Sequence, residues 1–182
     1  MLVLLTAASQ ASPAVIETCR TCHDEDGTGV GKDYVPIIAG IPPAHIEEAL
    51  RAYIGGARVC VVEPAMCAAA KQLSEEDIAA VARHYGALDR YSHATTFSEQ
   101  LAAEGAVIHD RLCANCHLAP DDPDVAAARG IPLHGQRADY LRYALDSYRR
   151  GDRQNLLPQM EEKISGLDER DVRALVNYYI SY

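Results

Sequence analysis

The stretch CRTCH at residues 19–23 returns as CANCH at residues 113–117, an offset of 94 positions in a chain of 182 residues. The same offset carries Met66 onto Met160, so each methionine follows the histidine of its CxxCH motif by 43 residues. A motif and a distant methionine that recur together at one period predict an internal duplication.

Helical patterns follow the same repeat, at an offset that drifts to 95 between the motifs. Apolar residues at helical spacing occur in both copies: Ile46, Ala49, Leu50 and Tyr53 in the first, and Leu141, Ala144, Leu145 and Tyr148 in the second. Ser74 with Asp77, and Asp168 with Asp171, have the spacing of capping boxes at the start of a last helix in each copy. Because no strand-like alternation is present, we expect an all-α fold.

The repeat divides the chain into two small domains, over residues 12–88 and 99–182, joined by a polar linker at 89–98. Residues 1–11, MLVLLTAASQA, resemble the end of a secretory signal peptide, and a frayed apolar terminus is the alternative. No other apolar run approaches the ~20 residues of a membrane span. We therefore expect a protein exported to the periplasm.

Composition narrows the function further. The net charge of −9 argues against a nucleic-acid partner, which needs a basic face. With no Trp and one Phe, two domains of this size have little large apolar material for their cores. Domains that small often need a cofactor, metal or disulfide to complete the interior.

In an exported chain, CxxCH is typical of c-type haem attachment. The thiols of each motif would form thioether bonds to a haem: Cys19 and Cys22 in the first copy, and Cys113 and Cys116 in the second. His23 and His117 follow directly and would be the proximal iron ligands. A zinc or redox dithiol site is the alternative, but two copies in a matched repeat favour two covalently bound haem c groups. The expected fold is therefore two tandem cytochrome c-like domains.

Met66 and Met160 are the candidates for the distal iron ligands, because they are matched in position within otherwise diverged loops. A thioether ligand raises the haem potential and leaves no vacant coordination position. Such a site suits electron transfer and disfavours peroxide chemistry, so we expect no catalytic residues on this chain. His134 is a competing ligand in the second copy, and a Met that merely fills a core gap is the other interpretation.

Two further pairs are candidates for holding the haems. The backbone carbonyls of Pro36 and Pro132 could accept a hydrogen bond from the proximal histidines. Arg58 and Arg153 occupy matched positions and could pair with haem propionates, or could be solvated arginines at helix ends.

Cys60 and Cys67 bracket Met66 and have no counterpart around Met160. In an oxidising compartment a disulfide is the default expectation. A Cu(I) site made by the two thiolates is the alternative.

Two segments of the second copy carry a resemblance to a known family. Residues 105–113 (GAVIHDRLC) and 133–145 (LHGQRADYLRYAL) resemble the GxxxHDxxC and AGQxxxYLxYA segments of the dihaem cytochrome subunit of flavocytochrome c sulfide dehydrogenase. The CxxCH and Met motifs are shared with cytochrome c4. The resemblance implies an FAD-containing flavoprotein partner that oxidises sulfide, with FAD on the partner only, and a soluble electron acceptor such as a small cytochrome c. A free-standing cytochrome c4-type shuttle to a terminal oxidase is the alternative, and a dihaem peroxidase is a third possibility.

Overall fold

The computed structural model describes residues 13–29, 31, 34–125, 128–154 and 157–182, so the predicted leader at 1–11 lies outside the described residues. Within these ranges the regular elements are all helices, which confirms the expected all-α class. They are α1 (Pro13–His23), α2 (Pro43–Ile54), α3 (Pro64–Ala70), α4 (Glu75–Gly86), α5 (Glu99–Leu112), α6 (Ala138–Arg150), α7 (Pro158–Ser165) and α8 (Glu169–Ile180).

The first half, α1 to α4, has its own apolar core. Helix α4 packs against α2 and α1, and Tyr85 and Ile78 of α4 are completely enclosed at its centre. Val15 and Ile16 of α1 pack onto the edge of the same cluster. The buried side chains of this core are mostly aliphatic, and Tyr85 is the one aromatic ring among them.

The second half, α5 to α8, repeats this arrangement with a closer helix pair. Helices α5 and α8 cross in extensive contact, and α6 packs on α8. Gly105 makes the crossing possible, because a Cβ at this position would overlap the carbonyl group of Ala174. Tyr179 and Leu175 of α8 form the centre of this second core.

The predicted capping boxes are confirmed in both halves. Ser74 Oγ accepts from the backbone N–H of Asp77, and Asp168 accepts from the backbone N–H of Asp171. In each box the partner carboxylate accepts from the backbone N–H of the cap residue in return. The last helix of each half therefore starts at a position set by local sequence.

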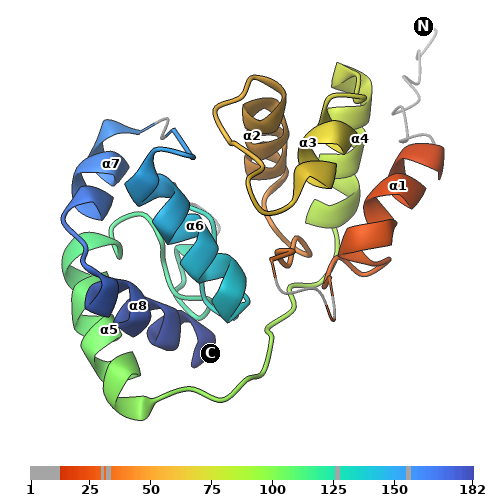
Figure 1. Ribbon diagram of the computed structural model, residues 1–182. Helices are drawn as coiled ribbons and strands as arrows, with labels where there is room; N and C mark the ends of the chain where they lie inside the picture. Colours follow the sequence, from red (N-terminus) through yellow and green to blue (C-terminus); the bar gives the residue numbers. More distant parts are fainter. Residues whose placement is uncertain (1–12, 30, 32–33, 126–127, 155–156) are drawn as a thin grey trace, which may run out of the picture.

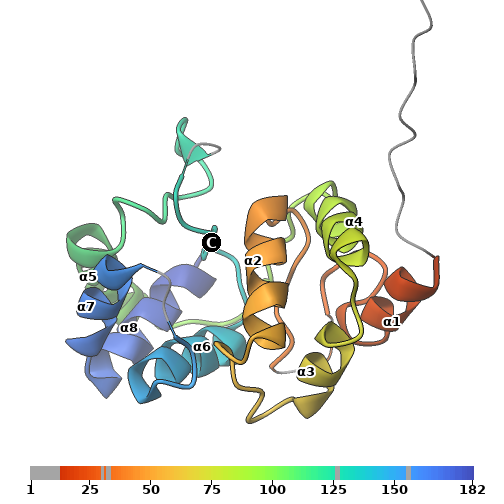
Figure 2. The same cartoon turned by 90° about the horizontal axis from the view of Figure 1, so that it is seen from above.

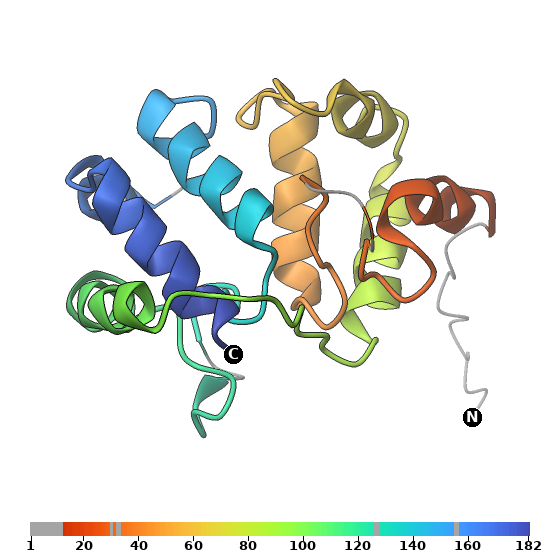
Figure 3. The same cartoon turned by 60° about the horizontal axis from the view of Figure 1, so that its bottom comes forward.

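The two halves lie side by side, with α2 and α6 facing each other across the junction (Figures 1 and 2). Residues 89–98 have no helix and run in extended form along one side of the molecule from α4 to α5 (Figure 3). No helix among the described residues has the length and apolar character needed to cross a bilayer.

The junction contains a small antiparallel bridge between the loops that follow α2 and α6. Arg58 pairs with Arg153. On either side, the N–H of Val59 donates to Asp152 O at 2.9 Å, and the N–H of Gln154 donates to Ala57 O at 2.8 Å. These bonds are related by the 95-residue offset, so the halves meet as two like surfaces around a local two-fold axis.

Candidate haem-binding sites

The two CxxCH motifs occupy equivalent places at the ends of helices. Cys19, Cys22 and His23 lie in the last turns of α1, whereas Cys113 caps α5 and the rest of its motif forms the following turn. None of the four motif cysteines takes part in the disulfide, and all four are partly buried. Both motifs therefore keep the thiols that haem attachment requires.

Both motif histidines hydrogen-bond through Nδ1 to a backbone carbonyl. His23 Nδ1 lies 3.3 Å from Pro36 O, the acceptor expected from the sequence. His117 Nδ1 lies 2.8 Å from Ile131 O, so the expectation of Pro132 is wrong by one residue. The acceptor is a main-chain oxygen, so a proline is not required at this position. The two acceptors, Pro36 and Ile131, are 95 residues apart, which is the offset of the adjoining helix. A Nδ1–H donor assigns Nε2 as the nitrogen for a metal.

The ring of His117 is packed directly against the main chain. Gly130 lies so close that a Cβ on it would overlap the imidazole, and its N–H donates to Cys116 O at 2.9 Å. Burial lowers the pKa of His117, although the Ile131 carbonyl works against this shift. The ring is therefore held neutral, which is the form that binds a metal.

Met66 and Met160 also occupy equivalent positions, each the third residue of a short helix that begins with proline. Met66, on α3, packs against the first-half core. Met160, on α7, is partly buried. The local geometry is thus repeated along with the spacing.

The predicted disulfide between Cys60 and Cys67 is confirmed, with Cα atoms 5.9 Å apart. Because both sulfurs are used in this bond, the alternative of a Cu(I) dithiolate does not apply to this structure.

Arg58 and Arg153 lie at the junction and not on solvated helix ends. The Arg58 guanidinium lies 5.5 Å from the centroid of the Tyr53 ring. Arg153 is only 4% exposed, and its guanidinium lies between 5.3 and 5.7 Å from the rings of Tyr140, Tyr143 and Tyr148. Burial by itself would raise the pKa of Tyr140, but the two guanidinium groups lower it overall, with Arg153 the stronger.

This arrangement fits an anionic cofactor group. Neither Arg58 nor Arg153 forms an ion pair with a carboxylate anywhere in the described ranges. A buried cation without an anion is costly. Carboxylates brought in by a bound group, such as haem propionates, would supply the missing charge.

His134 lies in a buried ring cluster. Its side chain is completely enclosed, and its ring contacts those of His109, Tyr178, Tyr179 and Tyr182 at centroid distances of 4.4–5.3 Å. Burial, followed by repulsion from His109 and Arg90, lowers the pKa of His134 to about 4. The imidazole is therefore neutral at physiological pH.

Two junction residues were not predicted. Gln136 bonds to both backbone groups of Ile37, accepting from its N–H and donating to its carbonyl at 2.9 Å each. Arg137 donates to Thr28 O at 2.9 Å across the same junction. In the repeat, the counterpart of Gln136 is Ile41, and this apolar-to-polar change is the signal that could have identified Gln136.

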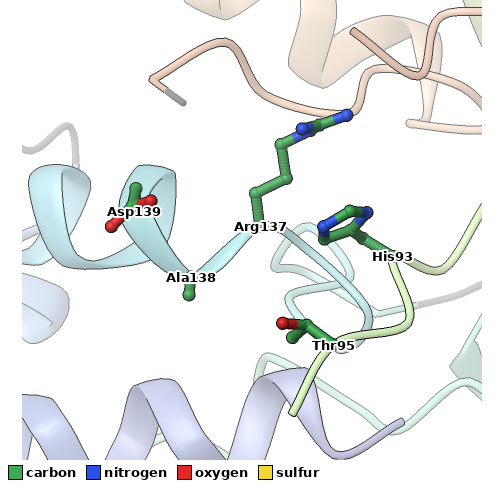
Figure 4. A pocket seen from close by; sticks show the side chains of 5 residues that line it. All are labelled: His93, Thr95, Arg137, Ala138 and Asp139. Atoms are coloured by element: carbon green, nitrogen blue, oxygen red, sulfur yellow. The ribbon is translucent and has the colours of Figure 1, made fainter. Parts of the chain in front are cut away.

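A small cavity of about 120 Å³ lies between the linker and the start of α6, lined by His93, Thr95, Arg137, Ala138 and Asp139 (Figure 4). The Arg137 side chain extends out of it toward the first half, where it meets Thr28 O. The cavity thus adjoins the junction and is distinct from the CxxCH motifs.

A duplicated all-helical fold with a CxxCH motif in each half defines a c-type cytochrome of the dihaem class, an electron-transfer protein. The chain is 31% identical over 179 residues, 93% of its length and 80% of the relative's, to the "Thiosulfate dehydrogenase electron acceptor" of Stutzerimonas stutzeri (strain A1501). This chain therefore belongs to the dihaem, cytochrome c4-like family of thiosulfate dehydrogenase electron acceptors. No family model matches it.

Two solved structures share this fold. The thiosulfate dehydrogenase TsdBA from Marichromatium purpuratum superposes with a TM-score of 0.73 at 29% identity, over 90% of this chain. This chain spans only 36% of that longer chain. Reduced recombinant cytochrome c4 from Pseudomonas stutzeri superposes with a TM-score of 0.72 at 22% identity, covering 94% of this chain and 98% of that one, which supports the fold.

Proposed function

We propose that the chain binds two haem c groups, one in each half, and relays electrons between a sulfur-oxidising enzyme and a soluble carrier. In each half the CxxCH cysteines would attach the haem, and His23 or His117 would be the proximal ligand. Met66 and Met160 would be the distal ligands, supported by their matched positions on α3 and α7. Each bound haem would supply a reversible one-electron iron couple.

The protein's own residues would set the properties of these sites. The carbonyls of Pro36 and Ile131 hold the proximal rings in one tautomer, and this contact increases the basicity of the ligand. Arg58 and Arg153 would neutralise the charge of haem propionates at the junction. With a histidine and a methionine as ligands, each iron would favour outer-sphere electron transfer over bond-making chemistry.

The electron donor would be a thiosulfate-oxidising enzyme. The observation that carries this step is the 31% identity, over nearly the whole chain, to a protein named as the electron acceptor of thiosulfate dehydrogenase. Two one-electron sites on one chain match a donor that removes electrons from its substrate in pairs. The sulfide-oxidising flavoprotein implied by residues 105–113 and 133–145 is the second candidate donor.

The proposed location is the periplasm. The Cys60–Cys67 disulfide supports an oxidising compartment. The net charge of −9 would suit docking on partners with a basic or mixed surface, such as a small cytochrome c.

Rapid-mixing absorbance measurements test the donor. The oxidised holoprotein is mixed with catalytic amounts of a thiosulfate dehydrogenase and thiosulfate, or of a sulfide-oxidising flavoprotein and sulfide. We expect full reduction of both haems in the first mixture, at a rate at least about tenfold above that of thiosulfate alone. Reduction by the flavoprotein mixture only would overturn the thiosulfate assignment in favour of the second candidate. No enzyme-dependent reduction in either mixture would indicate a free-standing shuttle.

A further inference from the structure

The helix that carries Met66, α3, has only a small side chain as its fully buried contact with the core. Ala70 is the one buried residue of α3, and its counterpart at the 94-residue offset is Ile164, the buried residue of α7. An alanine buries much less apolar surface than an isoleucine. The fully buried residue of the methionine helix therefore contributes less apolar burial in the first half than in the second.

The Cys60–Cys67 disulfide supplies a second attachment for α3. Cys67 directly follows Met66, and Cys60 lies in the loop after α2, two residues beyond Arg58 of the junction bridge. The disulfide thus ties the methionine helix to a well-anchored part of the loop. Glu161 occupies the position equivalent to Cys67, and the chain has no cysteine after Cys116, so the second half lacks this tie.

The tie is accessible from solvent. The two cysteines are partly exposed, and Val61 and Val62 between them are 60% and 41% exposed. A dithiol in solution can therefore approach this disulfide, whereas the Met66 side chain packs inward on the core.

We propose that the Cys60–Cys67 disulfide is a redox-sensitive latch that keeps Met66 in ligating position, so that its reduction loosens the axial methionine of the first half only. This inference rests on the proposed function, because it requires Met66 to be an iron ligand. The reductant is a dithiol, which passes two electrons and two protons to the S–S bond and is itself oxidised to a disulfide. Two thiols form on Cys60 and Cys67, and the bond between their sulfurs breaks.

Imidazole competition on the oxidised holoprotein tests the latch, because imidazole replaces a loosely held methionine. The readout is the weak near-infrared band of ferric haem with a methionine ligand. In the double variant Cys60→Ser, Cys67→Ser we expect half of this band to disappear at an imidazole concentration at least about tenfold lower than in wild type. The other half of the band should respond as in wild type.

A second measurement covers the case in which the serine variant does not fold. The folded wild type is treated with dithiothreitol, its new thiols are alkylated with iodoacetamide, and its haems are reoxidised. The same half of the band should become at least about tenfold more sensitive to imidazole.

The variant Met66→Leu tests the proposed iron ligand separately from the proposed latch. If this variant keeps the whole near-infrared band, Met66 is not a ligand and the proposed ligand set fails. If it loses half of the band while disulfide removal leaves imidazole binding unchanged, the ligand set stands and the latch is overturned.

Discussion

The first and second halves share one scaffold but differ at the segment that follows the histidine of each CxxCH motif. The first half has Ala39 and Ile41 where the second half has His134 and Gln136. Ile41 is part of the first-half core, whereas Gln136 reaches across the junction to the backbone of Ile37. The first half is apolar at both positions, whereas the second half has one polar side chain inside a buried ring cluster, His134, and one at the junction, Gln136.

Because of this difference, the side-chain contacts across the junction are asymmetric. The loop bridge around Arg58 and Arg153 is symmetric, since both halves contribute equivalent backbone groups. The side-chain bonds are not symmetric, because Gln136 and Arg137 of the second half bond to main-chain groups of the first. The polar side chains thus specify one arrangement of the halves beyond what the shared fold provides.

The largest expected effect is an acid sensitivity caused by His134, a contribution that the first half lacks because Ala39 stands at the equivalent position. The pKa of His134 is about 4 in the folded state against 6.5 for the unfolded chain, so the unfolded state takes up the proton first. As the pH is lowered from 6.5 to 4, the free energy of unfolding should decrease by up to about 3 kcal/mol. Below pH 4 this contribution should level off. His134→Phe should flatten this dependence, as measured by denaturant unfolding across that range. An unchanged pH slope would show that the buried imidazole does not cause it.

A smaller effect is expected from making the junction more symmetric. Gln136→Ile copies the first-half residue and leaves the buried N–H and carbonyl of Ile37 without their partner. We expect a loss of about 2 kcal/mol in the free energy of unfolding, because unsatisfied buried backbone groups are costly. Gln72→Ala, at an exposed position, is the control and should change stability by less than about 0.5 kcal/mol. Equal effects of the two substitutions would show that Gln136 does not stabilise the junction.

The smallest effect should be the same in both halves. Ser74→Ala and Asp168→Ala each remove the cap of a last helix. Each should cost about 1 kcal/mol, since the N-terminal N–H groups lose a side-chain acceptor. Thermal unfolding of the two variants side by side measures this. A difference between them of more than about 1 kcal/mol would show that the equivalent helices are not equally coupled to their cores.

The prediction from sequence succeeded where local spacing was sufficient. The helices around Leu50 and Leu145, the caps at Ser74 and Asp168, and the disulfide follow from periodicity, capping chemistry and the cysteine count. It failed by one residue at Pro132, because the carbonyl that a ring nitrogen meets depends on the path of the loop and not on the residue type.

The sequence by itself determined the duplication, the helical class, the two CxxCH motifs and the matched methionines, because each is a pattern along one dimension of the chain. Only the tertiary structure decided that Arg153 is buried among tyrosines, that Gln136 joins the halves, and that the buried residue of α3 is an alanine where that of α7 is Ile164. Local spacing does not encode those contacts. They depend on how the folded surfaces meet and on how much of each side chain becomes buried. Residues such as Ile37 and Gln136 are 99 positions apart, and packing alone brings them together.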